Sequence, residues 1–236
     1  MTVEHAPPTE YANQIVVRLR KRSLTKEPIP AFFESGQNQI VMNDTSDTTT
    51  VYLLRHAQST ASADIAVPDW PLSQLGSEQS LGIVDALNAL DLDHVYSSPY
   101  KRAIDTIKPY CTGKKLNTTI EDDLRERNLT DSFVTEGWDQ MMVNNWDDLN
   151  FATTNGESGY SCQHRIATCI LQIVTRHRGK TLLISSHGYA ISLFLNMMDH
   201  SFVYQQWKAM KNPDLFKIDY DADAPKWDKS FSWEMN

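Results

Sequence analysis

A short apolar run that ends directly on an arginine and a histidine is the feature that most constrains this chain. Residues 51–54 read Val-Tyr-Leu-Leu, and Arg55 and His56 follow immediately. β-Branched and aromatic residues in such a run predict a buried strand, and ligands of open α/β sheets bind beyond the carboxyl ends of the strands. The pair is therefore well placed to meet an anion, although a strand end that leads into a solvated loop is the commoner source of such a pattern.

Two later segments repeat the pattern. Residues 94–98 form a second apolar run, after which Pro99 begins a helix that carries Arg102 near its first turn. Backbone N–H groups at a helix N-terminus also attract anions. The alternative is a solvated ion pair between Arg102 and a nearby aspartate, and only the Ser-Ser-Pro-x-x-Arg-Ala context of residues 97–103 favours phosphate binding over it. Residues 181–186 form a third run, and His187 follows it. We expect these side chains to converge at one end of the sheet.

A carboxylate completes the set of candidate groups. Glu126 lies shortly after another predicted strand, residues 116–121, in the sequence Leu-Arg-Glu. A carboxyl group that is partly shielded from solvent can serve as a general acid and base near neutral pH. The same stretch offers other carboxylates, which remain alternatives for that role: Glu121, Asp122, Asp123 and Glu136.

Strands and helices alternate along the chain at crossover spacing, which predicts a parallel sheet covered on both faces. We therefore expect an α/β fold, a three-layer α/β/α sandwich with a mostly parallel, doubly wound sheet. Apolar residues at helical spacing from Leu81 to Leu90 predict a helix that packs on this sheet. Residues 215–220 predict an edge strand.

Composition divides the chain into two parts. Residues 1–48 lack clear periodicity and contain a basic cluster and a polar, proline-containing stretch, so we interpret them as an N-terminal extension and linker. Residues 49–236 are predicted to form the folded domain. Within it, residues 132–155 are rich in tryptophan, methionine and acidic side chains and predict a helical cap over the site. No Lys or Arg occurs between Arg127 and Arg165.

The ordered motifs resemble the histidine phosphatase superfamily, the phosphoglycerate-mutase-like phosphatases of branch 1. The signature of that family is a strand followed by Arg-His-Gly near the start and Ser-His-Gly near the end, which residues 55–57 and 186–188 resemble. The resemblance implies a phosphoglycerate-mutase-like fold. Two positions depart from the family pattern: Ala57 replaces the usual Gly, and Ser62 stands where many members have an Asn that helps to hold phosphate.

The resemblance also implies chemical roles. His56 would be the nucleophile that forms a phosphohistidine, and Glu126 would be the general acid and base. Phosphoryl transfer depends on positioning and charge stabilisation, and a guanidinium fork matches two phosphate oxygens. His187 would be a third catalytic residue beside His56 and Glu126. It would donate a hydrogen bond to phosphate if it is protonated. The expected phosphate-binding residues are Arg55, Arg102, His187, Ser62 and Gly188.

Three functions follow as hypotheses. The leading one is a phosphomonoesterase that hydrolyses a small phosphorylated metabolite through phospho-His56 and needs neither a metal nor another cofactor. The second is a phosphoglycerate mutase-type phosphotransferase, which the lack of cations in the predicted cap disfavours because a second anionic group needs cationic partners. The third is a catalytically silent fold that serves as a binding module, suggested by Ala57, Ser62 and the N-terminal extension.

Composition limits the partners and the setting. A net charge of −8 and a pI near 5.3 argue against nucleic acid or an anionic membrane, so a small phosphorylated substrate is the expected partner. A polar N-terminus and the lack of a bilayer-spanning apolar run favour a cytoplasmic protein. The 3 cysteines include no Cys-x-x-Cys, so neither a disulfide framework nor a zinc site is indicated. Whether the chain forms a homo-oligomer is left open.

Overall fold

The computed structural model describes residues 48–130, 136–221 and 224–235, and the compact unit that they form begins at Thr48. The predicted extension, apart from its last residue, therefore lies outside the described residues. Six strands form one sheet in the order β3-β2-β4-β1-β5-β6. Their bounds are β1 Thr49–Arg55, β2 His94–Ser97, β3 Thr118–Ile120, β4 Thr181–Ser186, β5 Asp214–Asp221 and β6 Ala224–Trp227.

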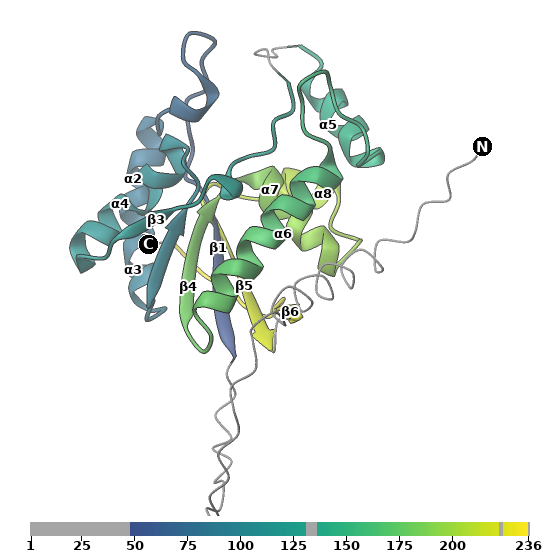
Figure 1. Ribbon diagram of the computed structural model, residues 1–236. Helices are drawn as coiled ribbons and strands as arrows, with labels where there is room; N and C mark the ends of the chain where they lie inside the picture. The colour runs from purple at the N-terminus through teal and green to yellow at the C-terminus, as the bar shows by residue number, and fades with distance from the viewer. Residues whose placement is uncertain (1–47, 131–135, 222–223, 236) are drawn as a thin grey trace, which may run out of the picture. The chain divides into compact units, whose positions relative to one another are not determined.

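Helices occupy most of the connections between these strands (Figure 1). None of the helices in the described part of the chain is long and apolar enough to cross a membrane. In chain order they are η1 Val67–Asp69, α2 Gln74–Gly82, α3 Val84–Asn88, α4 Lys101–Lys114, η2 Asp122–Leu124, α5 Trp138–Asp147, α6 Gly159–Arg176, α7 Gly188–Met198 and α8 Tyr204–Ala209.

The sheet is mostly parallel, as predicted. Strands β3, β2, β4 and β1 run in the same direction, whereas β5 runs antiparallel to β1 and to β6. The register of β1 against β4 pairs Arg55 with Ser186. The residues that follow, His56 and His187, therefore leave the sheet side by side. Register thus brings together two histidines that are far apart in the sequence.

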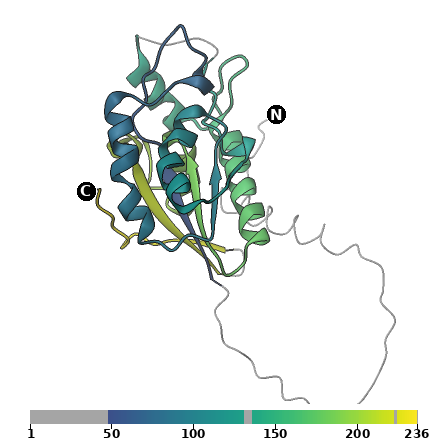
Figure 2. The same cartoon turned by 90° about the vertical axis from the view of Figure 1, so that its left-hand side faces the viewer.

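The sheet separates two hydrophobic cores, which gives the predicted three-layer sandwich (Figure 2). Side chains alternate between the faces of a strand. Val51 and Leu53 accordingly face α6 and α7, while Tyr52 and Leu54 face α3 and α4. Leu53 is fully buried, and its replacement by Ala would destabilise the fold by about 2–5 kcal/mol.

Two details of the fold differ from the sequence-based expectation. The helix expected through Leu81 and Leu90 is two helices, α2 and α3, and Leu81 is 65% exposed, whereas Ile83 at the junction is fully buried. The buried residues Gly76, Ser80, Ile83 and Leu87 keep one helical spacing across the junction, so the buried stripe runs through Ile83 and leaves Leu81 on the solvent side. Strand β5 lies inside the sheet and not at its edge, because the short strand β6 pairs with its C-terminal half.

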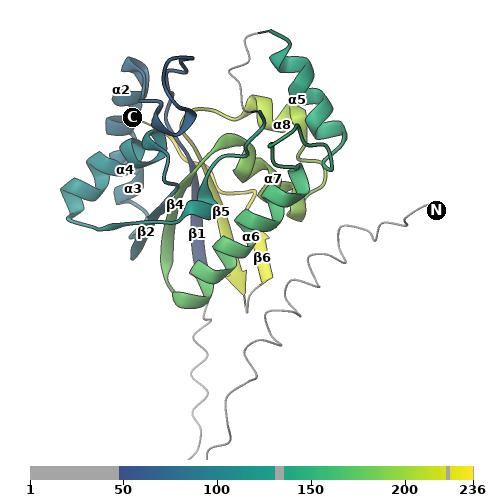
Figure 3. The same ribbon diagram turned by 45° about the horizontal axis from the view of Figure 1, so that its top comes forward.

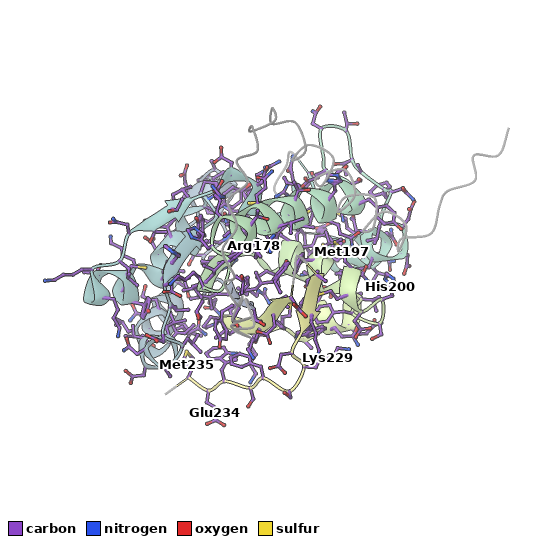
Figure 4. All side chains as sticks on the ribbon, turned by 60° about the horizontal axis from the view of Figure 1, so that its bottom comes forward. Arg178, Met197, His200, Lys229, Glu234 and Met235 are labelled. Carbon is purple, nitrogen blue, oxygen red and sulfur yellow. The ribbon has the colours of Figure 1, made fainter. Side chains whose placement is uncertain are left out.

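The segment after β6 packs against the side of the sheet that carries α3 and α4. Phe231 lies against Tyr52 with ring centroids 5.4 Å apart, and Trp233 packs on the same core. Lys229 pairs with Asp199, and Figure 4 shows Lys229 near the start of this segment and Glu234 and Met235 near its end.

Two segments rise from the end of the sheet where the parallel strands finish. One is the loop between β1 and α2, and the other carries α5 (Figures 1 and 3). Helix α5 lies within the predicted cap, residues 132–155, of which residues 131–135 at the start lie outside the described part. Within the cap, the side chains of Met142 and Trp146 are buried in the core, while those of Trp138 and Phe151 are exposed.

Candidate active site

His56 lies just beyond β1, buried, with both ring nitrogens engaged. Its Nδ1 is 2.7 Å from the carbonyl oxygen of Ala57, which can only accept, so Nδ1 carries the proton. Nε2 is then unprotonated and accepts a hydrogen bond from Arg102 Nε at 3.1 Å. Burial, and then the nearby charges of Arg102 and Arg55, lower the pKa of His56 to about 3. His56 is thus a neutral imidazole with its lone pair on Nε2.

The backbone that follows His56 is held from two sides. Ala57 N donates to Thr106 Oγ1 at 2.9 Å, and the side-chain amide of Asn212 donates to the His56 carbonyl oxygen at 2.7 Å. Ala57 does not have a positive φ angle, so an alanine is tolerated in place of the family's usual glycine.

Arg55 ends β1 beside the first residue of α7. Its Nη1 donates to the Met210 carbonyl oxygen at 2.8 Å, while its Nε is buried without a hydrogen-bond partner among the described residues. A Cβ on Gly188 would lie 2.9 Å from this Nε, so the glycine makes room for the guanidinium. Burial lowers the pKa of Arg55, and Glu126 and Asp214 oppose that shift. An unpaired donor in such a place suits a bound anion.

Arg102 lies in the first turn of α4, as predicted, and is almost fully buried. Besides donating to His56, it donates through Nη1 to the Val67 carbonyl oxygen at 2.7 Å. The guanidinium also lies between two aromatic rings, 5.6 Å from the Trp70 ring centroid and 4.9 Å from that of Tyr100. The loop between β1 and α2 therefore holds Arg102 against the histidine.

His187 is fully buried next to His56, with ring centroids 5.2 Å apart. Its Nε2 lies 2.7 Å from Ser98 Oγ, and its Nδ1 has no partner among the described residues. Burial, and then the charges of Arg102 and His56, lower the pKa of His187 well below its ordinary value. The ring is therefore neutral, whereas the sequence suggested a protonated ring as the phosphate donor.

Glu126 is the predicted carboxylate that the fold brings to this cluster. Its carboxylate accepts backbone N–H groups of Tyr189 and Ala190, at 3.1 and 2.9 Å, at the N-terminus of α7. Arg127 N donates to it as well, at 2.9 Å. Glu126 also acts electrostatically on both Arg55 and Arg102.

The alternative carboxylates that form ion pairs do so elsewhere. Glu121 pairs with Arg176 at 2.7 Å, and Asp123 pairs with Arg125 at 3.0 Å. Ser62, expected to contact phosphate, is engaged within its own loop: its Oγ accepts from Asp64 N at 3.1 Å, and its carbonyl oxygen accepts from Trp70 Nε1 at 3.0 Å. Its contact with phosphate stays a prediction.

Arg127 is a residue that the sequence analysis did not single out. Only 3% of it is exposed, and its guanidinium donates to acceptors of the cap, of the loop before α6 and of α7. The only available signal was its position directly after Glu126. The acceptors are the Asn145 Oδ1, the Tyr189 hydroxyl and the carbonyl oxygens of Glu157 and Phe151, all within 2.9 Å.

No cluster of three or more His, Cys, Asp or Glu side chains that could hold a metal occurs within the ranges 48–130, 136–221 and 224–235. Cys162 and Cys169 are buried in the packed face of α6, as expected of core residues.

Two neutral imidazoles and two guanidiniums at the carboxyl end of a mostly parallel sheet define an α/β protein with a site suited to phosphoryl groups. Residues 51–231 match the histidine phosphatase superfamily (branch 1). The chain belongs to that family.

Similar proteins include phosphatases and mutases. The probable phosphoglycerate mutase GpmB of Cronobacter sakazakii is 24% identical over 72% of this chain and 84% of that protein. Phosphoglycerate mutase-like protein 4 of Arabidopsis thaliana is 27% identical over 61% of this chain and 69% of that protein. A mycobacterial glucosyl-3-phosphoglycerate phosphatase in complex with VO3 has the same fold, with 21% identity and a TM-score of 0.65, covering 76% of this chain and 96% of its own.

Proposed function

We propose that this protein is a metal-independent phosphomonoesterase that works through a phosphohistidine on His56. The observation that carries the proposal is the state of the His56 ring, which is buried, neutral and unprotonated at Nε2, next to two guanidiniums. An unprotonated nitrogen of a neutral imidazole is a competent nucleophile toward phosphorus. The substrate would be a small phosphorylated metabolite.

The first chemical step would form a bond from His56 Nε2 to phosphorus. Because Arg102 Nε donates to that nitrogen in the ligand-free protein, the incoming phosphoryl oxygens must first draw the guanidinium away. Arg102 and Arg55 would then stabilise the charge on the equatorial oxygens. The P–O ester bond breaks, its electron pair leaves with the alkoxide, and Glu126 supplies the proton.

The second step would release phosphate. A water molecule attacks phosphorus, the P–N bond breaks, and its electron pair returns to His56 Nε2. Glu126, now ionised, takes the proton from that water. The backbone N–H groups of Arg127, Tyr189 and Ala190 fix this carboxylate in place, so the same group can serve both steps.

A mutase reaction is the second candidate, since two relatives carry mutase names. Transfer between positions of a phosphoglycerate requires the protein to hold a carboxylate together with the phosphate. Residues 128–164, which include the cap, contain no Lys or Arg. Arg165 nearby is already paired with Glu157 at 2.6 Å. These charges favour hydrolysis of a monoester over mutase chemistry.

The test is phosphate release from a panel of phosphomonoesters in EDTA, with His56→Ala as the inactive variant. His94→Ala is the matched control, because His94 begins β2 at the opposite end of the sheet. We expect release that persists in EDTA, is retained by His94→Ala and is lost in His56→Ala. Release that survives in His56→Ala would contradict the phosphohistidine. If the folded protein releases phosphate from none of the esters, the result would favour a mutase that needs a priming phosphate, or a non-catalytic binding module.

A further inference from the structure

Ser98 lies directly after β2, and its side chain contacts His187. It is fully buried, and its backbone N donates to the Ser185 carbonyl oxygen at 2.9 Å, which fixes its position relative to β4. Its hydroxyl oxygen accepts a hydrogen bond from Tyr100 N at 3.2 Å and lies 2.7 Å from His187 Nε2.

The proton of this hydroxyl determines the state of the histidine. A buried O–H group left without an acceptor costs about 1–3 kcal/mol. His187 Nε2 is the acceptor that the described residues offer, since the other hydrogen bond of Ser98 Oγ is one that it accepts. The hydroxyl therefore donates to Nε2, which must be unprotonated. In a neutral ring the proton then resides on Nδ1.

We propose that Ser98 is a positioning residue that fixes His187 as its Nδ1–H tautomer, so that this N–H is the ring's one donor for the phosphoryl group. The donation from His187 Nδ1 to a phosphoryl group rests on the proposed function. Nδ1 is the ring nitrogen without a partner among the described residues, so any hydrogen bond from His187 to a substrate uses it. A neutral His187 can thus donate to phosphate without being protonated.

The two histidines hold the same tautomer for opposite purposes. His56 uses Nδ1–H to bond the Ala57 carbonyl oxygen and keeps its Nε2 lone pair for phosphorus. His187 uses its Nε2 lone pair on Ser98 and keeps Nδ1–H. The hydrogen-bond partner of each ring therefore fixes its role: His56 is the nucleophile, and His187, whose ring centroid lies 5.2 Å away, is the donor.

The matched pair of variants is Ser98→Ala and Ser97→Ala. Ser97 is equally buried, but its hydroxyl donates to the Ser98 carbonyl oxygen, and no hydrogen bond joins it to a histidine among the described residues. Histidine ¹⁵N–¹H correlation spectra of the ligand-free full chain report which ring nitrogen is protonated. A His187→Gln spectrum assigns the signals, and Ser98→Cys provides a second variant if Ser98→Ala does not fold.

We expect His187 to show protonated Nδ1 and unprotonated Nε2 in the unmodified protein and in Ser97→Ala, and to gain Nε2–H in Ser98→Ala. Turnover of the best phosphomonoester should fall about 10²- to 10³-fold in Ser98→Ala, as for loss of one preorganised donor, with little change in Ser97→Ala. A protonated Nε2 in the unmodified protein, or an unchanged tautomer in Ser98→Ala, would overturn the assignment. The expected tautomers without any turnover would support Ser98's role and contradict the proposed function.

Discussion

Gly188→Ala should affect the candidate site more than the fold, because the three atoms nearest to the new Cβ all belong to Arg55. The new Cβ would lie 2.9 Å from Arg55 Nε, 3.0 Å from Cζ and 3.3 Å from Nη2. These atoms belong to the far end of a flexible side chain, so the guanidinium can move away. Gly188 does not have a positive φ angle, so alanine adds no backbone strain.

The contacts of Arg55 give the expected size of the change in stability and of the change in turnover. Moving the guanidinium breaks the 2.8 Å hydrogen bond from Arg55 to the Met210 carbonyl oxygen, and because the donor is charged this costs about 1.5–3 kcal/mol. Replacing glycine by alanine in α7 offsets at most about 0.5–1 kcal/mol. The free energy of unfolding should therefore fall by only about 1–2 kcal/mol. Turnover should fall about 10²- to 10³-fold, because one preorganised phosphate donor is displaced.

The assay combines urea unfolding with steady-state phosphate release. Gly113→Ala in α4 is the control, since a Cβ there meets nothing within 4 Å, and it should keep full turnover with equal or greater stability. If Gly188→Ala retains turnover within about threefold of the unmodified protein, then Arg55 either stays in place or does not hold the phosphoryl group. Loss of folding in Gly188→Ala would contradict the energetic argument.

Four further results are expected. Arg102→Ala should lower turnover about 10²- to 10³-fold in the phosphate-release assay, and a loss below threefold would refute its role in charge stabilisation. Because His56 has a pKa of about 3 when folded and an ordinary value when unfolded, the unfolded chain binds more protons, so stability should fall as pH drops below about 6.5, by up to about 1.4 kcal/mol per pH unit; His56→Gln should show a shallower slope in urea unfolding at several pH values. Arg127→Met should lower the free energy of unfolding by about 1–3 kcal/mol for each buried acceptor that it leaves unpaired, such as Asn145 Oδ1, whereas Arg125→Met, at a partly exposed ion pair, should change it by less than about 1 kcal/mol. Deletion of residues 1–47 should leave turnover within about twofold, since the family match lies within residues 51–231; loss of turnover in a folded deletion variant would assign the extension a catalytic role.

Local patterns were sufficient to place the candidate site residues that directly follow a strand. Arg55, His56 and His187 follow β-rich runs, so their place at the carboxyl edge could be predicted from residue order alone. The alternation of strands and helices likewise predicted the sandwich. The pattern failed at Leu81, because the leucines suggested a stripe through Leu81 whereas the stripe that packs on the sheet runs through Ser80, Ile83 and Leu87.

The sequence by itself determined which residues reach the carboxyl end of the parallel strands, since the last residues of a strand are a local property of the sequence. Only the tertiary structure decided their chemical states. The proton on His187 depends on Ser98, which is 89 residues away in sequence, and the lone pair of His56 faces Arg102, which is 46 residues away. Burial of both rings, which keeps them neutral, also arises only when the layers pack together.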